Sequence, residues 1–450
     1  MSPRHAVRRT PAFTRYWTLT QLTGLTDPWR IGSANSARRG STVPLLALEG
    51  IRVIELATDV AGPFCGKLLA DYGAEVIKVE PPDSGDPSRR AGPFPGGSPH
   101  LEKSALFLHL NTNKAGVTLD LSAEAGQDIL KRLVERSQVL IESHKPGRLE
   151  AMGLGYQALQ KLRPDLVMTS VTPFGQTGPS KDDEYTELTV FAAGGAMHRE
   201  GIPSREPLKY GAQAAQYFAG TSAAAATTAA CLGAALTGRG EWIDVSMQEC
   251  MAGHPHQIGR RAPFAYAGEV DVRKDPHTPY FGGREPYAVG TFQCRDGYVS
   301  FLPLGPRMWP NITRMIGRPE LVDDPRFASA QQRVDNREAL TAIFQPWLDS
   351  HTRTEVFEAA QDAGLPGAPV LTTGEVVADE HFSARGFFVD IDHPDAGTLT
   401  YTGLPFTISN TPATPPAPAP RLGQHTDEVL EKVLGVGADE RQELRRHGVI

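Results

Sequence analysis

The stretch that decides the fold is LEGIRVIELATDVAGPFCGKLLADYGAEVIKVEPP, residues 48–82. An apolar run at 51–56 predicts a short buried strand, and helical spacing follows from 64 to 72. Gly73 ends that helix before a second apolar run at 76–79. A strand, a helix and a second strand within about thirty residues predict a βαβ unit, whose two strands are parallel.

The same alternation continues along the chain. Further strands are predicted at 115–121, 139–141, 166–171, 297–301 and 368–371, and further helices at 124–136, 153–161, 307–316, 338–348, 354–363 and 426–434. Strands and helices that alternate in this way predict an α/β fold with an open parallel sheet.

Composition narrows the classes of function. The chain has 450 residues, a net charge of −7 and 40% apolar residues, so neither nucleic acid nor an anionic membrane is an expected partner. Its four cysteines lie far apart without a C-x-x-C pair, which argues against a disulfide framework and predicts a reducing, cytoplasmic location. No metal site is predicted, because His254 and His256 stand in a Pro-rich segment typical of a solvated loop.

Two segments need separate interpretation. Residues 211–238 contain no charged residue and are rich in Ala, Thr, Ser and Gly, which favours a helix packed inside the protein over a membrane span. Residues 1–46 contain seven Arg and a single acid, Asp27, without the continuous apolar core of a signal peptide. A disordered basic extension is expected there, with an overlong start or a transit-like segment as alternatives.

The turn at 59–63 stands at the carboxyl end of the first strand. Open parallel sheets bind ligands at this edge. The turn matches neither G-x-G-x-x-G nor a P-loop, so no motif supports a nicotinamide cofactor or a nucleoside triphosphate.

The stretch 48–82 resembles the opening of the class III CoA-transferases, a family that includes formyl-CoA transferase, carnitine CoA-transferase and alpha-methylacyl-CoA racemase. Further blocks resemble the family in the same order: 111–114 with 119–121, 142–147 with 152–156, 170–179, 237–247 and 422–430. The resemblance extends over roughly 48–450. It implies acyl-CoA and a free carboxylic acid as substrates, and no permanently bound cofactor.

The resemblance also implies a fold: a Rossmann-like large domain built from both chain ends, a smaller middle α/β domain, and two protomers interlocked as rings. The expected parts are a basic extension (1–46), the first part of the large domain (47–253), a linker or crossing loop (254–295), the small domain (296–345) and a C-terminal part that returns to the large domain (346–450). The unpatterned 254–295 suits a crossing segment.

Family transferases attack the thioester with an Asp carboxylate. Alignment of the following small-residue helix puts Gln216 at that position, and no acid occurs between Glu206 and Glu241. A neutral amide has no anionic oxygen with which to attack. The remaining catalytic candidates are Glu187, which aligns with a carboxylate near the acyl group, and Asp59 as a relocated nucleophile. Cys250 is interpreted as a buried thiol.

Family racemases pair the same Asp with a His in a G-H-D stretch. Residues 184–186 of this chain are Glu, Tyr and Thr, so racemisation is the less favoured activity.

Several segments are expected to border CoA. The residues predicted to bind it are Val60, Ala61, Lys78, Pro81, Leu119, Ser143, His144, Lys145 and Met247. Ser143 and His144 replace an Asn-Phe pair of the family, and Ala151 stands where an Arg commonly meets the nucleotide phosphates, so CoA binding is expected to be weakened. Phe191, Met197 and Tyr217 would line an apolar acyl region.

Two functions follow. The first is an enzyme that transfers CoA between carboxylic acids through Glu187, Asp59 or a partner's carboxylate, as a homodimer or a heterodimer. The second is a non-catalytic CoA-binding subunit, whose Asp-bearing paralogue completes a heterodimer.

Overall fold

The computed structural model describes residues 46–254, 262–270, 272–273, 287–303, 305, 308–411 and 416–450. Of the predicted N-terminal extension, only the last residue, Leu46, falls within these ranges. Most of the predicted crossing loop, and part of the Pro-rich run at 412–420, lie outside the described residues.

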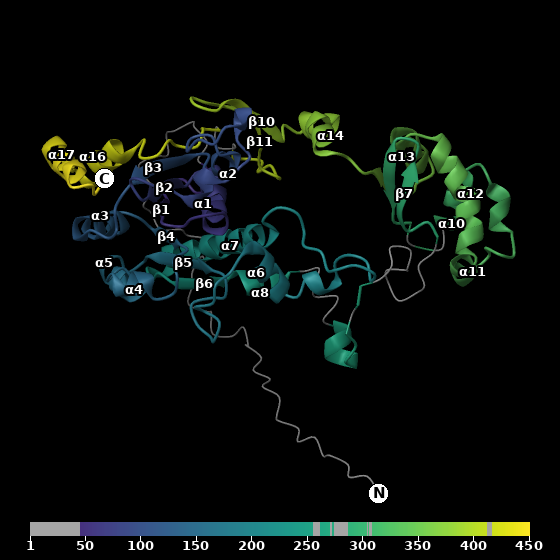
Figure 1. Cartoon of the computed structure of the whole chain (residues 1–450), viewed down its shortest axis with the longest axis horizontal. Helices are drawn as coiled ribbons and strands as arrows, with labels where there is room; N and C mark the ends of the chain where they lie inside the picture. Colours follow the sequence, from purple (N-terminus) through teal and green to yellow (C-terminus); the bar gives the residue numbers. More distant parts are fainter. Residues whose placement is uncertain are drawn as a thin grey trace, which may run out of the picture. The chain divides into compact units, whose positions relative to one another are not determined.

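A six-stranded sheet forms the centre of the larger core (Figure 1). Its strands are β1 (Arg52–Glu55), β2 (Glu75–Glu80), β3 (Lys114–Thr118), β4 (Val139–Glu142), β5 (Val167–Thr172) and β6 (Trp242–Ser246). All neighbouring pairs are parallel and the order is β3-β2-β1-β4-β5-β6. This is a strand order of doubly wound nucleotide-binding sheets. The predicted α/β class with a parallel sheet is confirmed.

Helices cover both faces of this sheet. In chain order they are α1 (Ala61–Asp71), α2 (Ala105–Leu110), α3 (Glu124–Glu135), α4 (Arg148–Ala151), α5 (Tyr156–Leu162), α6 (Glu187–Ala193), α7 (Ala214–Thr237), α8 (Met247–Gly253), α16 (Thr426–Leu434) and α17 (Ala438–Arg446). Val53 packs in the core with α1 and α7, whereas its neighbour Ile54 packs in the core with α3, α5 and α16. Successive strand residues point to opposite faces, so an unbroken apolar strand supplies both cores.

The predicted internal helix at 211–238 is α7. One face, which includes Ala219, Gly220 and Ala223, is buried against α1 and the sheet, while Leu232 and Leu236 are exposed. Of the described helices, α7 alone is long and apolar enough to cross a membrane, a test that the core helix of a soluble protein also passes. About a third of that helix (33%) is buried, so α7 packs one small-residue face inside the protein and leaves the rest of its surface partly or fully exposed.

A second core surrounds a three-stranded antiparallel sheet. Its elements are β7 (Gly290–Cys294), β8 (Gly297–Phe301), β9 (Gly367–Pro369), α10 (Met308–Met315), α11 (Ala330–Asp335), α12 (Arg337–Ser350) and α13 (Arg353–Asp362). β7 lies within the segment predicted as linker. Val356, Ala360 and Leu365 share the core of Phe344 and so pack with the small sheet.

The remaining elements are α14 (Thr373–Ala378), α15 (Glu380–Ala384), β10 (Phe388–His393) and β11 (Gly397–Thr402). The antiparallel hairpin β10–β11 packs its Ile391 and Tyr401 against Phe107 of α2. From there the chain returns to the large sheet, where Thr118 N donates to Thr426 Oγ1 at 3.0 Å. The division into domains and the interlocked dimer stay predictions.

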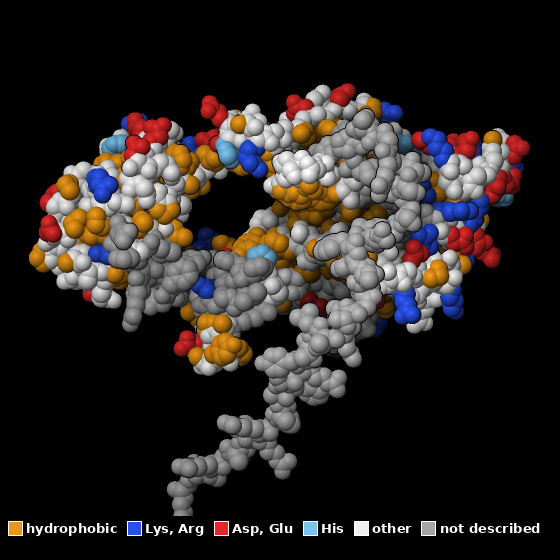
Figure 2. Space-filling view, turned by 180° about the vertical axis from the view of Figure 1, so that it is seen from behind, with side chains coloured by type: hydrophobic (Ala, Val, Ile, Leu, Met, Phe, Trp, Pro, Cys, Tyr) orange, Lys and Arg blue, Asp and Glu red, His pale blue; other side chains and the backbone are white. Residues whose placement is uncertain are grey.

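The visible surface carries charges of both signs. On the face shown in Figure 2, Lys and Arg side chains are interspersed with Asp and Glu and do not form a continuous basic field. This mixture agrees with the modest net charge of −7.

Candidate active site

The order of the sheet reverses between β1 and β4, and ligands of open α/β sheets bind outside the carboxyl ends of the strands at such a point. The turn after β1 holds Asp59, Val60 and Ala61, and the turn after β4 holds Ser143, His144 and Lys145. The two turns are bonded directly, because Thr58 N donates to Ser143 Oγ at 2.9 Å. The structure thus brings six of the predicted site residues to one edge.

These six residues differ in what they offer a ligand. Val60 and Ala61 are buried at the start of α1. Burial lowers the pKa of His144 to about 4, so its ring is neutral at pH 7. Lys145 is exposed and forms an ion pair with Glu184. Lys145 is therefore the cation of this turn that solvent reaches.

The other predicted CoA residues lie in β2 or directly after β2, β3 and β6. Pro81 is exposed directly after β2, whereas Leu119 and Met247 are core residues. Lys78 is fully buried, and its Nζ donates to Glu55 Oε1 (3.0 Å), Ala57 O (3.0 Å) and Asp86 Oδ2 (2.8 Å). An ammonium has three donors, so this geometry gives Lys78 an internal role and leaves no donor for a phosphate.

Gln216 lies in the first turn of α7, where this helix meets α1. A Cβ on Gly220 would come within 2.6 Å of Ala61 O, which shows how closely the two helices approach. Gln216 precedes Gly220 by one helical turn on the same face and is only 8% exposed. Within the described part of the chain its Oε1 has no hydrogen-bond donor. A buried amide acceptor without a donor is uncommon and costly.

Glu187, the first residue of α6, is already engaged by the backbone of α7. Its Oε1 accepts a hydrogen bond from Ala215 N (2.9 Å), and its Oε2 accepts one from Gln216 N (3.3 Å). Lys209 Nζ lies 3.7 Å from Oε1. The carboxylate therefore caps the N-terminus of α7, where an anion is favoured by the free amides and the helix dipole. Both of its oxygens are used in holding position 216.

Asp59, the other predicted carboxylate, is partly exposed. Its backbone is in the left-handed region (φ +63°), and its N–H donates to Asp86 Oδ1 at 3.2 Å. Among the described residues no hydrogen bond or ion pair reaches the Asp59 carboxylate. Burial raises its pKa, as does the charge of Asp86, while Lys78 opposes the shift. Burial raises the pKa of the Tyr185 phenol, and the nearby charge of Asp59 raises it further.

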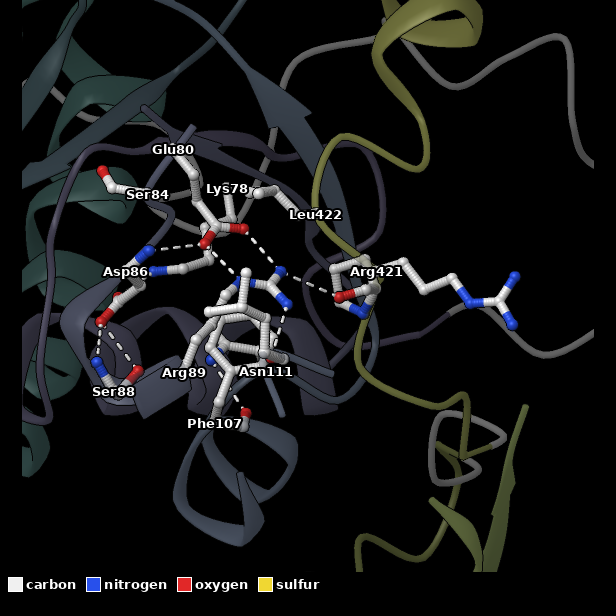
Figure 3. A network of polar contacts seen from close by, with 12 residues as sticks. Lys78, Glu80, Ser84, Asp86, Ser88, Arg89, Phe107, Asn111, Arg421 and Leu422 are labelled. Atoms are coloured by element: carbon white, nitrogen blue, oxygen red, sulfur yellow. Dashed lines mark hydrogen bonds and ion pairs between the residues drawn. The ribbon is translucent and has the colours of Figure 1, made fainter. Parts of the chain in front are cut away.

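A buried network of charges behind the turns was missed in the sequence (Figure 3). Arg89 donates to both oxygens of Glu80 at 2.8 Å and to Glu102 Oε2 at 2.7 Å, and its guanidinium lies 3.6 Å from the Phe107 ring centre. Lys114 lies 2.8 Å from Glu55 Oε2. The signal that could have found this network is the presence of charged residues within apolar strands, because buried charges require partners.

A further turn, at 173–179, is held beside the first two. Gln176 N donates to both oxygens of Asp244 at 3.0 Å, and Gln176 Nε2 lies 3.4 Å from Glu142 Oε1. Glu142 Oε2 accepts from His144 N at 2.7 Å. Burial raises the pKa of Glu142 to about 7, although hydrogen bonds from Ser170 and His144 oppose the shift.

The residues expected to line the acyl region are less open than predicted. Phe191 is fully buried with its ring centre 5.1 Å from that of Tyr210. Tyr217 is half-buried and contacts Phe64 edge to face at 4.8 Å. Met197 is half-buried against the same core. Met197 and Tyr217 are therefore more accessible than Phe191.

The geometry does not favour a metal site at the candidate histidines or a nucleophilic role for Cys250. The ring of His254 lies 4.2 Å from that of Phe218, and His256 is outside the described residues. Within the described ranges no group of three or more His, Cys, Asp or Glu residues is arranged to hold a metal ion. Burial raises the pKa of Cys250, which keeps this thiol protonated at neutral pH.

Comparison with known proteins adds an independent line of evidence. The chain is similar to the beta subunit (34% identity, 91% of this chain and 99% of the relative) and the alpha subunit (31%, 90% and 93%) of succinyl-CoA–L-malate CoA-transferase from Chloroflexus aurantiacus. Its fold is similar to the crystal structure of a CAIB/BAIF family protein from Brucella suis, with a TM-score of 0.77, 30% identity, and 86% and 99% of the two chains covered. Residues 48–426 match the model of CoA-transferase family III, so the chain belongs to that family.

Proposed function

We propose that the chain binds acyl-CoA and takes part in transferring CoA between carboxylic acids. The observation that carries this proposal is the family match over 48–426, which spans the whole six-stranded sheet. The turns after β1 and β4 support it, because they supply backbone and a basic side chain at the ligand-binding edge of the sheet. CoA enters the reaction as the substrate thioester and not as a resident cofactor.

In the first reading the chain is itself the enzyme, and Asp59 replaces the family nucleophile. A carboxylate oxygen attacks the thioester carbon and expels CoA thiolate, which leaves a mixed anhydride on the protein. The thiolate then attacks the side-chain carbonyl of that anhydride, so the enzyme holds CoA as a thioester and the first acid leaves. The incoming acid reverses both steps. The unengaged carboxylate of Asp59 supports this assignment over Glu187.

The second reading is a non-catalytic CoA-binding subunit of a heterodimer. Gln216, which the family resemblance aligns with the nucleophilic Asp, favours it. Glu187 favours it too, because both of its carboxylate oxygens are used by the backbone of α7. The similarity to both subunits of one Chloroflexus transferase also supports it. In this reading an Asp-bearing paralogue supplies the carboxylate, and the two chains interlock in the cytoplasm.

One set of assays distinguishes the two proposed functions. The purified chain is tested for CoA exchange between a panel of acyl-CoAs and free acids, beside Asp59→Asn, Gln216→Asp and the matched uncharged variant Gln216→Asn. We expect Gln216→Asp to raise turnover by about a thousandfold or more, because loss of a nucleophile typically costs at least that factor, whereas Gln216→Asn gives no gain.

Turnover by the unmodified chain that Asp59→Asn abolishes would support the first reading. An inactive chain that becomes active with an Asp-bearing paralogue, or by Gln216→Asp alone, would support the second. Absence of CoA binding by the unmodified chain would reject both readings.

A further inference from the structure

The backbone of the turn after β1 is fixed by side chains from three other segments. Ala57 O accepts a hydrogen bond from Lys78 Nζ of β2 at 3.0 Å. Thr58 N donates to Ser143 Oγ at 2.9 Å, and Asp59 N donates to Asp86 Oδ1 at 3.2 Å. Three consecutive residues of the turn are thus each held by one long-range bond.

Asp86 connects the turn to Lys78, and Figure 3 shows it beside Ser88 and Glu80. Its Oδ1 also accepts from Ser88 N (2.8 Å) and Ser88 Oγ (2.7 Å), and its Oδ2 accepts from Lys78 Nζ (2.8 Å). Its own N–H donates to Glu80 Oε1 at 2.8 Å. The side chains of Asp86 and Lys78 are both completely inaccessible to solvent. A buried pair with this many bonds holds one geometry.

The turn needs such support because Asp59 has a positive φ. The left-handed region brings Cβ too close to the backbone in an L residue, and such conformations persist where the surroundings enforce them. The bond from Asp59 N to Asp86 holds the chain at this residue, and the bond from Lys78 to Ala57 O holds it two residues earlier. Neither Lys78 nor Asp86 has surface to offer a ligand.

We propose that Lys78 and Asp86 are positioning residues of the acyl-CoA site, which fix the backbone at Asp59 and the first residues of α1. This inference rests on the proposed function, because the turn matters for CoA only if CoA binds there. It changes the role expected for Lys78, from a residue that touches CoA to one that acts through the turn.

The test compares Asp86→Asn with Asp71→Asn, a matched variant. Asp71 pairs with Lys67 at 2.9 Å and is mostly buried, and as the last residue of the same α1 it lies ten residues along the helix from Ala61. We expect Asp86→Asn to weaken CoA binding about tenfold in calorimetry, as suits loss of one charged hydrogen-bond partner, and Asp71→Asn to leave it unchanged. Asp86→Ala, which keeps no acceptor for Asp59 N, should weaken binding further.

Hydrogen exchange of the ligand-free proteins supplies a second readout. Amides in a peptide spanning 57–61 should exchange faster in Asp86→Asn than in the unmodified chain, and at the unmodified rate in Asp71→Asn. If Asp86→Ala fails to fold, Asp86→Asn carries the comparison alone. Unchanged exchange and unchanged CoA affinity in Asp86→Asn would overturn the inference. An unmodified chain that binds no CoA would instead reject the proposed function, and the exchange data would still decide whether Asp86 holds the turn.

Discussion

Glu142 is expected to make the stability of the large sheet depend on pH near neutrality. It is the last residue of β4, is 3% exposed, and has a pKa raised by burial from its ordinary 4.5 to about 7. At about 1.4 kcal/mol per pH unit, holding this carboxylate ionised in the folded state costs about 3 kcal/mol. Replacement by the neutral amide in Glu142→Gln should remove that cost.

The direction of this pH dependence of stability follows from how many protons the folded and unfolded chains bind. Between pH 4.5 and 7 the folded chain retains the Glu142 proton and the unfolded chain releases it, so this group lowers stability as pH rises through that window. Above pH 7 Glu142 is ionised in both states, and the free energy of unfolding does not fall further because of this group. The advantage of Glu142→Gln should therefore grow by about 2.5 kcal/mol between pH 5 and pH 8.

The measurement is urea unfolding at a series of pH values, followed by pulsed hydrogen exchange in peptides from β4 and β5. This readout reports the six-stranded sheet separately from the smaller core. Glu135→Gln, at an exposed residue at the end of α3, is the matched control for the change from a carboxylate to an amide. A Glu142→Gln advantage that is constant with pH, or larger at pH 5 than at pH 8, would refute the reasoning.

Two further predictions concern packing and thiol chemistry. Gly220→Ala should destabilise the fold by about 1–3 kcal/mol in thermal unfolding, because its Cβ would lie 2.6 Å from Ala61 O, whereas Gly233→Ala on the same helix has open space and should stabilise by about 0.5–1 kcal/mol. Equal effects of the two changes would contradict the observed helix contact. Burial raises the pKa of Cys65 to about 12 and also raises that of Cys250, so both thiols should be alkylated far more slowly at pH 8 in the folded than in the unfolded protein. A rapid stoichiometric reaction at folded Cys250 would be evidence against an inert thiol.

Hydrophobic patterning predicted most of the parallel sheet. The apolar runs at 51–56, 76–79, 139–141 and 166–171 correspond to β1, β2, β4 and β5, because strands buried on both faces read as continuous apolar runs. The hairpin β10–β11 was missed although its strands alternate polar and apolar residues. Helix α17 was missed because a sequence with so few apolar residues has no periodicity to detect.

The location of the candidate site could be predicted, but the roles of its residues could not. Topology brings the turns after β1 and β4 together whatever their side chains are, and the hydrogen bond from Thr58 N to Ser143 Oγ joins them at one edge. The role of Glu187 depends on which donors reach its oxygens, and those donors are backbone amides of a helix that begins 27 residues later. Sequence alone does not specify such a partner.

Charged residues within apolar strands indicate buried partners even when the sequence does not identify them. Glu55, Lys78 and Glu142 each lie within or at the end of an apolar strand, where an unpaired charge would be too costly to bury. Their presence therefore requires partners, even before those partners are known. Gly66 is a second indication that Glu55 has buried partners. A Cβ at position 66 would lie 1.8 Å from Glu55 Oε2, so a larger residue would displace the carboxylate from Lys78 and Lys114. A glycine within the first helix and a glutamate ending the first strand are thus explained by the same ion pairs, and those ion pairs are joined through Lys78 to the turn proposed to receive acyl-CoA.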